Sequence, residues 1–380
     1  MEIRQLVVSG AALAEADLSL LVDLSPQLVL VFASLQSLRD GPAWDRLRAQ
    51  LPQAQWMGSS TAGEISNEGV DDGQVVLTGI RWTHARFRVV SVAYEGAEDS
   101  QAAGQRLGQA LGAEDLRHVF VLGQGARING SALVAGLTGS VGAHVVVTGG
   151  LAGDAGQFSG SLVLGPDGIS DRHLVALGLY GDAVQVSHGS FGGWQAFGPV
   201  RKVTRCEGHV LYELDGERAL DIYKRYLGDY AAQLPASGLL FPWAMLGADH
   251  QAVGLIRTIL AVDEEAGSLV LAGDVIQNGY LQLMQASVNA LVDAAEDAAQ
   301  AAHEALTHEG ATLVLLVSCI GRKLVMGGRV DEEVEAVGAV FGPQATLVGF
   351  YSNGEISPLF GTTECQLHNQ TMTITTWRES

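Results

Sequence analysis

The sequence predicts an α/β protein of two related layered lobes, an internal repeat in which mixed sheets are flanked by helices. Three observations support this fold class. The 380 residues exceed what one hydrophobic core usually supports, which favours two domains. Short aliphatic runs alternate with alanine-rich segments, a pattern typical of layered α/β domains. One motif also occurs twice, as PQAQWMGSSTAGEIS at Pro52–Ser66 and as PQATLVGFYSNGEIS at Pro343–Ser357, with eight identical positions in register.

The elements that lead into each copy of the motif are expected in the same order: strand, helix, strand. In the first half they are Gln27–Ala33, Pro42–Gln50 and Gln55–Gly58, and in the second half they are Thr312–Ser318, Asp331–Phe341 and Thr346–Tyr351. The simplest source of an identical order is one folding unit used twice. We therefore expect Gly63 and Gly354, the second glycines of the two copies, at equivalent topological positions.

The segment Val184–Thr204 is the expected junction between the two domains. A strand with an alternating pattern ends there in a glycine-rich stretch with a Gly-Pro pair, before another strand begins. We therefore predict one domain at residues 1–190 and a second at residues 191–380. Beyond the junction, apolar residues at helical spacing predict the longest helix at about Leu281–Thr307.

The composition argues against several classes of partner. The chain carries 42 acidic and 22 basic residues, for a formal net charge of -20. Phosphate backbones and anionic membrane surfaces attract basic proteins, so we expect neither a nucleic acid nor a membrane as partner. The chain does not start with a basic segment followed by an apolar one, and no apolar run approaches the roughly 20 residues that span a bilayer. These features predict a cytoplasmic protein.

The reactive side chains do not form a recognisable catalytic pattern. Cys206, Cys319 and Cys365 lie far apart in the sequence, which argues against a disulfide framework and against a structural zinc site. Cys319 is followed by Arg322 and Lys323, but no histidine is adjacent, and we expect a buried, inert thiol. We therefore expect that the protein is not an enzyme.

The repeated motif has the features of a binding turn. Its glycines are free to adopt positive φ or to let another backbone approach, and the polar side chains between them offer hydrogen bonds. Turns at the carboxyl ends of sheet strands are where open α/β folds place ligands. In the alternative interpretation, both copies are only tight turns whose glutamates cap neighbouring backbone. The candidate ligand residues are Gly58, Ser60, Thr61, Gly63 and Glu64 in the first copy and Tyr351, Asn353, Gly354 and Glu355 in the second.

Several dissimilar motifs occur in the order found in the FIST family, which the chain resembles over nearly its whole length. They are GSSTAGEIS, GGLAGDAG (Gly149–Gly156), GGWQAFGPVRKVTRCEGHVLYELDGERALDIYKRYLG, SCIGRK, GFYSNGEISP and LHNQTMTITT. The resemblance implies an N-terminal and a C-terminal FIST domain, and a bacterial intracellular sensory module that binds small ligands. His368, in LHNQT, matches a general position of the family and is expected to belong to the shared fold.

One branch of the family that the chain resembles consists of haemoproteins that sense nitric oxide. The resemblance implies haem b as cofactor, with His188 as axial ligand of the haem iron and Gly189 leaving space for the flat macrocycle. It also implies nitric oxide as ligand, and a histidine kinase, or a diguanylate cyclase or phosphodiesterase, as signalling partner. A homodimer is an assembly that the resemblance allows. The other expected haem-binding residues are Phe191, Trp194, Phe197, Arg201 and Lys202.

Three functions remain open on the sequence alone. The first is a haem-binding gas sensor. The second is a FIST sensory module that binds an amino acid or a similar small metabolite at the two motif copies, without haem. The third is an enzyme whose site the sequence does not reveal. A lone histidine at a strand end is usually solvated or hydrogen-bonded, and the aromatic residues near it can equally form core between two domains, so the motif at His188 does not decide the question.

Overall fold

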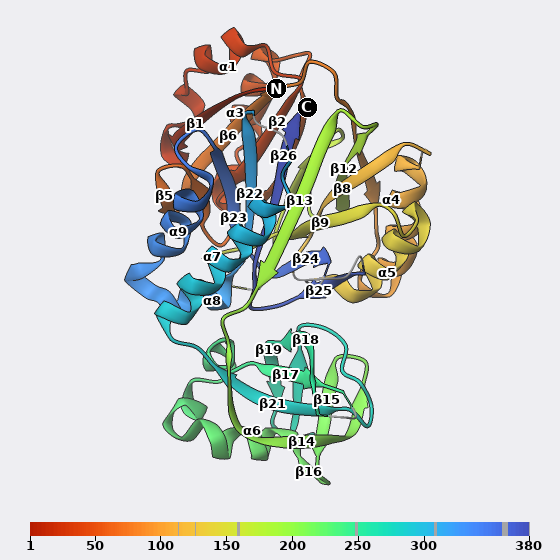
Figure 1. The fold of residues 1–380 in the computed structure, drawn as a ribbon. Helices are drawn as coiled ribbons and strands as arrows, with labels where there is room; N and C mark the ends of the chain where they lie inside the picture. Colours follow the sequence, from red (N-terminus) through yellow and green to blue (C-terminus); the bar gives the residue numbers. More distant parts are fainter. Residues whose placement is uncertain are drawn as a thin grey trace.

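Three mixed sheets with the same strand order form the body of the molecule, and a smaller β domain lies at one end of it (Figure 1). The computed structural model describes the chain apart from residues 113, 126, 158–159, 248–249, 308–309, 359–363 and 380. The body consists of three α/β units that follow one another along the chain. Unit 1 covers residues 2–81, unit 2 covers residues 86–180, and unit 3 covers residues 184–191 together with 288–379.

Each unit has the same element order: strand, helix, strand, helix, strand, hairpin, strand. Unit 1 contains β1 (Glu2–Ser9), α1 (Ser19–Leu24), β2 (Leu28–Ala33), α2 (Leu35–Leu38), α3 (Gly41–Gln50), β3 (Gln55–Ser60), β4 (Glu64–Ser66), β5 (Gly69–Asp71) and β6 (Gln74–Arg81). Unit 2 contains β7 (Arg86–Ala93), α4 (Ser100–Leu111), β8 (Leu116–Gly123), α5 (Gly130–Val141), β9 (Val146–Leu151), β10 (Val163–Gly165), β11 (Gly168–Ser170) and β12 (His173–Tyr180). Unit 3 contains β13 (Val184–Phe191), α7 (Val288–Glu304), β22 (Thr312–Cys319), α8 (Ile320–Met326), α9 (Asp331–Phe341), β23 (Thr346–Ser352), β24 (Gly354–Pro358), β25 (Cys365–His368) and β26 (Met372–Glu379).

Each unit completes the sheet of another unit with its hairpin. The three sheets have the orders β1-β6-β2-β3-β10-β11, β7-β12-β8-β9-β24-β25 and β13-β26-β22-β23-β4-β5. The hairpin of unit 2 therefore joins the sheet of unit 1, the hairpin of unit 3 joins that of unit 2, and the hairpin of unit 1 joins that of unit 3. Only the pairs β2–β3, β8–β9 and β22–β23 are parallel among these strands. This cyclic exchange links the units into one closed body.

One glycine in each unit explains part of the sequence repeat. Gly58, Gly149 and Gly349 pair with equivalent residues of the parallel neighbour strand. A Cβ atom at these positions would lie 2.0, 1.9 and 1.9 Å from a carbonyl oxygen of that neighbour. No side chain fits at such distances, so the close approach of the two strands requires glycine. The motif GGLAGDAG is thus a third copy of the corner, and we call Gly58–Ser66, Gly149–Gly156 and Gly349–Ser357 the first, second and third corners.

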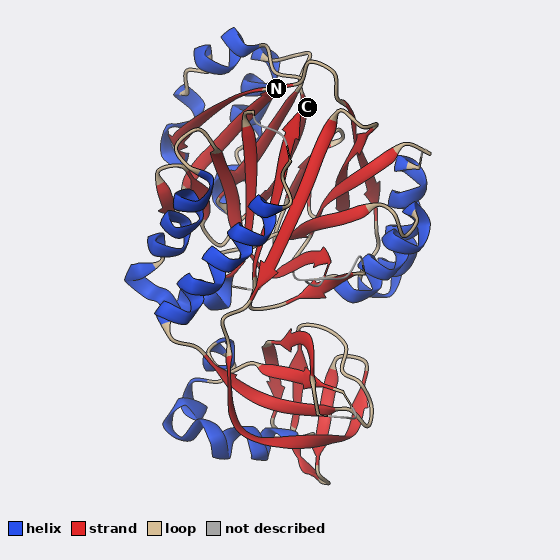
Figure 2. Ribbon diagram, viewed as in Figure 1, coloured by secondary structure: helices blue, strands red, loops and turns tan. Residues whose placement is uncertain are grey.

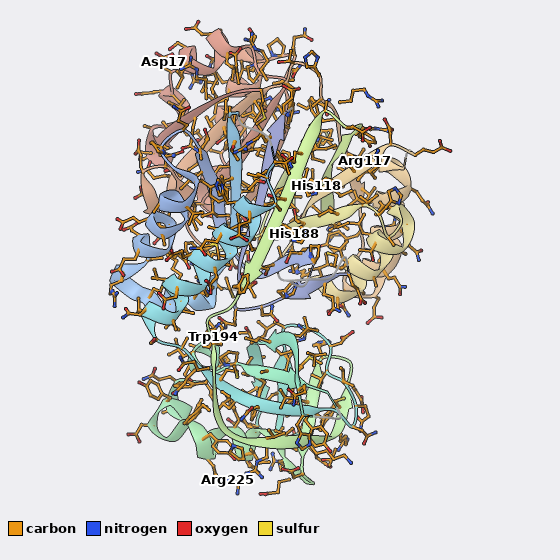
Figure 3. The ribbon with its side chains drawn as sticks, in the orientation of Figure 1. Asp17, Arg117, His118, His188, Trp194 and Arg225 are labelled. Carbon is orange, nitrogen blue, oxygen red and sulfur yellow. The ribbon has the colours of Figure 1, made fainter. Side chains whose placement is uncertain are left out.

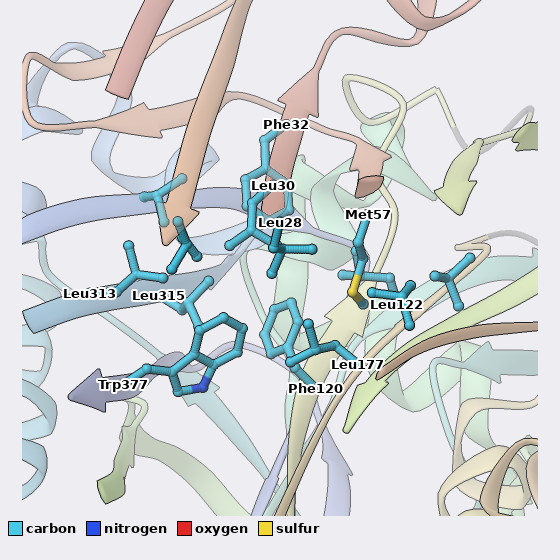
Figure 4. Close-up of a cluster of buried hydrophobic side chains, with 14 of the residues drawn as sticks. Leu28, Leu30, Phe32, Met57, Phe120, Leu122, Leu177, Leu313, Leu315 and Trp377 are labelled. Carbon is cyan, nitrogen blue, oxygen red and sulfur yellow. The ribbon is translucent and has the colours of Figure 1, made fainter. Parts of the chain in front are cut away.

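The core of the body lies between the three sheets, and the helices cover their outer faces (Figure 2). Phe32, Phe120, Leu315 and Trp377, which come from all three units, are fully buried or nearly so in this central cluster (Figure 4). The rings of Phe120 and Trp377 meet edge to face with centroids 5.8 Å apart. Each sheet also buries a second cluster against its own helices. Strands with both faces covered are expected to be nearly continuous apolar runs, as LVLVFA in β2 is.

The small domain is inserted into unit 3, between β13 and α7. Its eight-stranded sheet has the order β18-β17-β21-β14-β15-β20-β19, and β16 pairs with β15. Fully buried Trp243 and Tyr223 pack in its core. The elements are β14 (Gln195–Glu207), β15 (Val210–Leu214), β16 (Glu217–Arg218), α6 (Ala219–Leu227), β17 (Trp243–Leu246), β18 (Ala252–Arg257), β19 (Ile259–Asp263), β20 (Ser268–Leu271) and β21 (Tyr280–Gln285).

The structure confirms the predicted α/β fold class and most of the predicted elements, but the described chain repeats the unit three times rather than in two lobes. Mixed sheets are flanked by helices, and the repeated corners occupy equivalent positions, because each follows a strand that is parallel to the second strand of its unit. The chain leaves the body at the end of β13, at the boundary predicted between residues 190 and 191, but it returns to the body at α7, so residues 191–380 are divided between the small domain and unit 3. The helix predicted at Leu281–Thr307 is wrong in its first turns, because Tyr280–Gln285 is strand β21 and α7 begins at Val288.

Candidate functional site

The three corners meet at one end of the body and are hydrogen-bonded to one another. The backbone N–H of Ala62 donates to Tyr351 O (2.8 Å), that of Tyr351 to Gly63 O (2.9 Å), that of Gly153 to Ser60 O (3.0 Å) and that of Asn353 to Leu151 O (3.0 Å). The carboxyl ends of β3, β9 and β23 therefore converge. Polar side chains that are distant in the sequence become neighbours at this point.

Glu64 of the first corner is buried and holds the hairpin of unit 1 against the next strand. Its Oε1 accepts a hydrogen bond from the Thr61 hydroxyl, and its Oε2 accepts from the backbone N–H groups of Gly73 (2.9 Å) and Gln74 (3.0 Å). Burial raises the pKa of the Glu64 carboxyl to about 7, against these hydrogen bonds, which lower it. Glu64 therefore carries a proton for part of the time at neutral pH.

Glu355 of the third corner repeats this arrangement. Its Oε1 accepts from the Ser352 hydroxyl (2.6 Å), and its Oε2 accepts from the backbone N–H (3.2 Å) and the hydroxyl (3.0 Å) of Thr371. Burial raises the pKa of this carboxyl to about 7 as well. Both glutamates thus bond to the segment that begins the last strand of their unit, as the alternative interpretation of the motif expects.

A cavity of about 850 Å³ opens beside the first corner. We call it the first-corner cavity. Charged groups of both signs line it, and hydroxyl and amide groups lie among them. Its polar lining consists of Ser34, Gln36, Arg39, Thr61, Glu64, Asp72, Asp154, Gln157 and Lys323. These residues come from units 1, 2 and 3, so the cavity depends on the meeting of the corners.

Lys323 of α8 is the cation held closest to the first corner. Its Nζ donates to Ala62 O at 2.9 Å and forms an ion pair with Asp72. It also lies 5.4 Å from the centre of the Tyr351 ring, within the range of a cation–π contact. Gly63, at φ 138°, permits this approach, because a Cβ there would lie 2.4 Å from Nζ. The side chain of Lys323 is 15% exposed, so it is screened only in part by solvent.

Asp154 of the second corner brings a buried acid to the same cavity. It is 2% exposed, and its Oδ2 accepts from the backbone N–H of Gly160 at 3.1 Å. Sequence reasoning missed Asp154, Asp72 and Lys323 as site residues. The sequence feature that could have identified Lys323 is the motif SCIGRK, and the one that could have identified Asp154 is the motif GGLAGDAG.

The family models match most of the chain. The FIST N domain model matches residues 27–217, and the FIST C domain model matches residues 219–358. The chain belongs to the FIST family. The border between the two models falls within the small domain, at β16. No curated protein matches this FIST protein in sequence.

One solved structure that resembles this FIST protein is that of cyanuric acid hydrolase from A. caulinodans. The two chains are 10% identical, the similarity covers 98% of each chain, and the TM-score is 0.33. A similarity of this size supports no conclusion about function. Among the described helices none is long and apolar enough to cross a bilayer.

The residues expected to bind haem do not form one slot in the FIST body. His188 lies in the middle of β13, opposite Thr375, and Trp194 lies where the chain enters the small domain (Figure 3). Gly189 leaves no room for a macrocycle on its own side, because a Cβ there would lie 2.1 Å from Ala298 O of α7. Neighbouring residues of a strand point to opposite faces of the sheet. His188 therefore faces away from α7, toward the space between the sheets.

The other expected haem residues are engaged elsewhere. Phe191 packs in the cluster beneath α7, on the face of β13 opposite to His188, and Phe197 packs in the core of the small domain. Trp194 Nε1 donates to Gln370 O at 2.8 Å. Arg201 bonds to Tyr226 and Asp215 (Nη2 to Tyr226 Oη 2.6 Å), while Lys202 is exposed on the small domain. These six residues do not fit a single haem pocket.

His188 instead lies near a second histidine inside the body. His118 of β8 is fully buried, and burial lowers its pKa to about 3, a direction to which the nearby imidazole of His188 adds. Burial also lowers the pKa of His188. Both imidazoles are therefore held neutral near pH 7. Across the described residues, no group of three or more His, Cys, Asp or Glu side chains is arranged to hold a metal ion.

The remaining predicted ligand residues have structural partners, with one exception. The Ser60 hydroxyl donates to Gly153 O (2.6 Å) and accepts from the Leu162 N–H. The Tyr351 hydroxyl donates to Glu333, which is in a buried ion pair with Arg322. Gly354 pairs with Leu151 in the sheet of unit 2. The exception is Asn353, whose side-chain amide lies apart from the first-corner cavity and forms no hydrogen bond with the described protein atoms.

Proposed function

We propose that this FIST protein is a sensory module that binds a small zwitterionic metabolite, an amino acid or a close analogue, in the first-corner cavity. FIST domains are sensory modules. The observation that carries the proposal is the lining of one cavity by Lys323 and Arg39 together with Glu64, Asp72 and Asp154. A cation and an acid at separate points of a small cavity match the carboxylate and the ammonium of a zwitterion.

The proposed contacts follow from the charges. Lys323, held at the backbone of the first corner, would attract the ligand carboxylate, and Asp154, which is buried, would attract the ligand ammonium. Thr61 and Gln157 add neutral hydrogen-bonding groups. A ligand carboxylate would compete with Asp72 for Lys323, and because Asp72 is 73% exposed, its displacement into water costs little.

The proposal concerns binding rather than catalysis. The amine of Lys323 is held by Ala62 O and by the ion pair with Asp72, and the proposal uses it as a fixed cationic contact rather than as a nucleophile. Haem and nitric oxide are not part of the proposal, because the six residues expected for haem do not share a cavity. A histidine kinase, diguanylate cyclase or phosphodiesterase as output partner stays a prediction.

Isothermal titration calorimetry with the standard amino acids tests the proposal. We expect at least one to bind, and its decarboxylated and deaminated analogues to bind at least tenfold more weakly. Lys323→Met should weaken binding by a similar factor, whereas Lys224→Met, which removes a half-buried, ion-paired lysine of the small domain, should not. Absence of binding by every amino acid, or equal binding by the Lys323 variant, would rule the proposal out.

A further inference from the structure

A second cavity, of about 550 Å³, lies between the body and the small domain. We call it the interdomain cavity. The body contributes the loop after β8, the start of α5 and residues of the second and third corners, and the small domain contributes the end of β20 and the segment that follows it. Figure 1 shows β24 and β25 at the end of the body that faces the small domain. A molecule in this cavity would touch both parts of the protein.

Asn353 is the unusual residue of this cavity. Its side chain lines the cavity, the residue is 8% exposed, and neither Oδ1 nor Nδ2 has a hydrogen-bond partner among the described protein atoms. A buried amide without partners is unfavourable, and native proteins nearly always satisfy such groups. A group from outside the protein is the simplest partner for both atoms.

The fold itself does not require an amide at this position. In the aligned corner motifs Asn353 corresponds to Ala62, and the first corner makes the same turn with alanine. Moreover, Gly125 lies against the amide, where a Cβ would be 2.7 Å from Nδ2 and 2.0 Å from Ala152 O. The third corner therefore carries an extra polar group that its backbone geometry does not use.

The charged side chains of the interdomain cavity do not select an anion. Glu98 and Arg127 of the body and His209 and Asp274 of the small domain line it, and all four are exposed. Two acids offset the one arginine, and exposed charges are screened by solvent. The buried part of the lining is apolar except for Asn353, with Leu151, Leu271 and Leu367 beside it.

We propose that the interdomain cavity binds a small molecule with an uncharged carboxamide group, which pairs with the amide of Asn353. Oδ1 accepts and Nδ2 donates, side by side, so the matching group presents a donor beside an acceptor. A carboxylate of the same shape places an acceptor against Oδ1 and carries a charge into an apolar recess, which disfavours it. This site is separate from the first-corner cavity and does not depend on its occupancy.

A ligand in this position would also act on the domain arrangement. The body and the small domain are joined by buried hydrogen bonds, from Gln370 Nε2 to Leu239 O (2.9 Å) and from Arg257 Nη1 to Leu367 O (3.2 Å). A ligand that contacts both sides stabilises the arrangement to which it binds. The position of the small domain relative to the body would thus depend on whether the interdomain cavity is occupied.

The test uses the full chain and three matched pairs of probes that are not zwitterionic amino acids: butyramide and butyrate, benzamide and benzoate, and nicotinamide and nicotinate. By calorimetry we expect at least one carboxamide to bind, with its carboxylate partner at least tenfold weaker. Asn353→Ala, which copies the first corner, should weaken carboxamide binding at least tenfold, and Lys224→Met, a change outside both cavities, should leave it within twofold. If no carboxamide binds, or if Asn353→Ala binds as the wild type does, the proposal is overturned.

A second variant tests the same cavity independently if Asn353→Ala is unstable. Leu260 of β19 lines the interdomain cavity from the small domain and is 36% exposed, so a larger side chain there can be accommodated at the surface. Leu260→Trp should fill part of the cavity and reduce carboxamide binding at least tenfold, with an unchanged melting temperature. Unreduced binding by a folded Leu260→Trp protein contradicts the assignment.

Discussion

At the scale of single residues, the glutamates of the first and third corners are structural groups whose carboxyl pKa values are raised. Glu64 and Glu355 each accept hydrogen bonds from a hydroxyl three residues before them and from the chain that follows their hairpin. Both are buried, and burial raises the pKa of each carboxyl from an ordinary 4.5 to about 7. The folded protein therefore binds protons that the unfolded chain releases.

This predicts a pH effect that a single substitution removes. A carboxyl whose pKa is higher in the folded state stabilises the fold at low pH, and this contribution is lost as pH rises from about 4.5 to about 7. For Glu355 the loss is at most about 3 kcal/mol. In Glu355→Gln, which resembles the protonated form, we expect the free energy of unfolding to fall less between pH 5 and pH 7.5 than in the wild type.

Urea unfolding at the two pH values measures this difference. The comparison with wild type is needed because buried histidines with lowered pKa, such as His118 and His368, produce the opposite slope. Glu335→Gln, on the exposed face of α9, is the control and should follow the wild type. Identical slopes for wild type and Glu355→Gln would show that Glu355 does not titrate in this range.

The glycines at the start of the corners give a second prediction. Gly349→Ala should lower the free energy of unfolding by roughly 3 kcal/mol or more, because the new Cβ would lie 1.9 Å from Leu316 O and the two strands would have to separate. Gly139→Ala in α5 is the matched control. Its Cβ has no atom within 4 Å, and alanine favours a helix by about 1 kcal/mol over glycine. Thermal or urea unfolding that finds equal losses would contradict this account of the corner.

At the scale of elements, the sequence predicts the strands and helices around the corners of units 1 and 3 to within a few residues. Strong aliphatic runs such as β2 and β22 are reliable signals for buried strands. The start of the predicted long helix fails because Leu281 and Leu283 of β21 point into the core of the small domain, and alternation over six residues resembles part of a helical stripe.

Unit 2 could not be recognised as a third repeat from the sequence. Its corner, GGLAGDAG, keeps the glycine that parallel pairing requires, but its hairpin begins only at Val163, after additional residues. In register, Val163 takes the place of Glu64 and Glu355, because each of the three pairs with the residue after the conserved glycine. The candidate site could likewise be predicted only in part. The first and third corners share a sequence motif, whereas Lys323 and Asp154 reach the first-corner cavity only through the fold.

The two faces of β13 lead to a prediction about haem. His188 points away from α7, and Phe191, an odd number of residues further along, lies beneath α7. We therefore expect haemin titrations of wild type, His188→Ala and the exposed-histidine control His209→Ala to give the same visible spectra, with and without nitric oxide. A Soret band that is lost only in His188→Ala would place an axial ligand at His188 and reverse this expectation.

At the scale of the whole molecule, the exchanged hairpins make the units interdependent. The hairpin of unit 1 completes the sheet of unit 3, and that of unit 3 completes the sheet of unit 2. When the chain is divided in the loop between β12 and β13 into fragments 1–182 and 183–380, fragment 1–182 should fail to unfold cooperatively alone, whereas fragment 183–380 keeps the small domain with its own core. Their mixture should regain native circular dichroism and a cooperative transition. A cooperative transition in isolated fragment 1–182 would show that units 1 and 2 are independent of unit 3.

The same cyclic exchange sets an order of events during synthesis. Strand β4 leaves the ribosome early, yet its neighbour in the sheet, β23, is translated only after the small domain and most of unit 3. Until then the polar backbone of the first hairpin, and the edge of β9 that β24 will later cover, stay open to other nascent chains. A hairpin that pairs with a second molecule in this interval produces an interlocked dimer with the same contacts. Slow translation and protection by chaperones should therefore matter more for the yield of this protein than for a chain whose sheets close one after another.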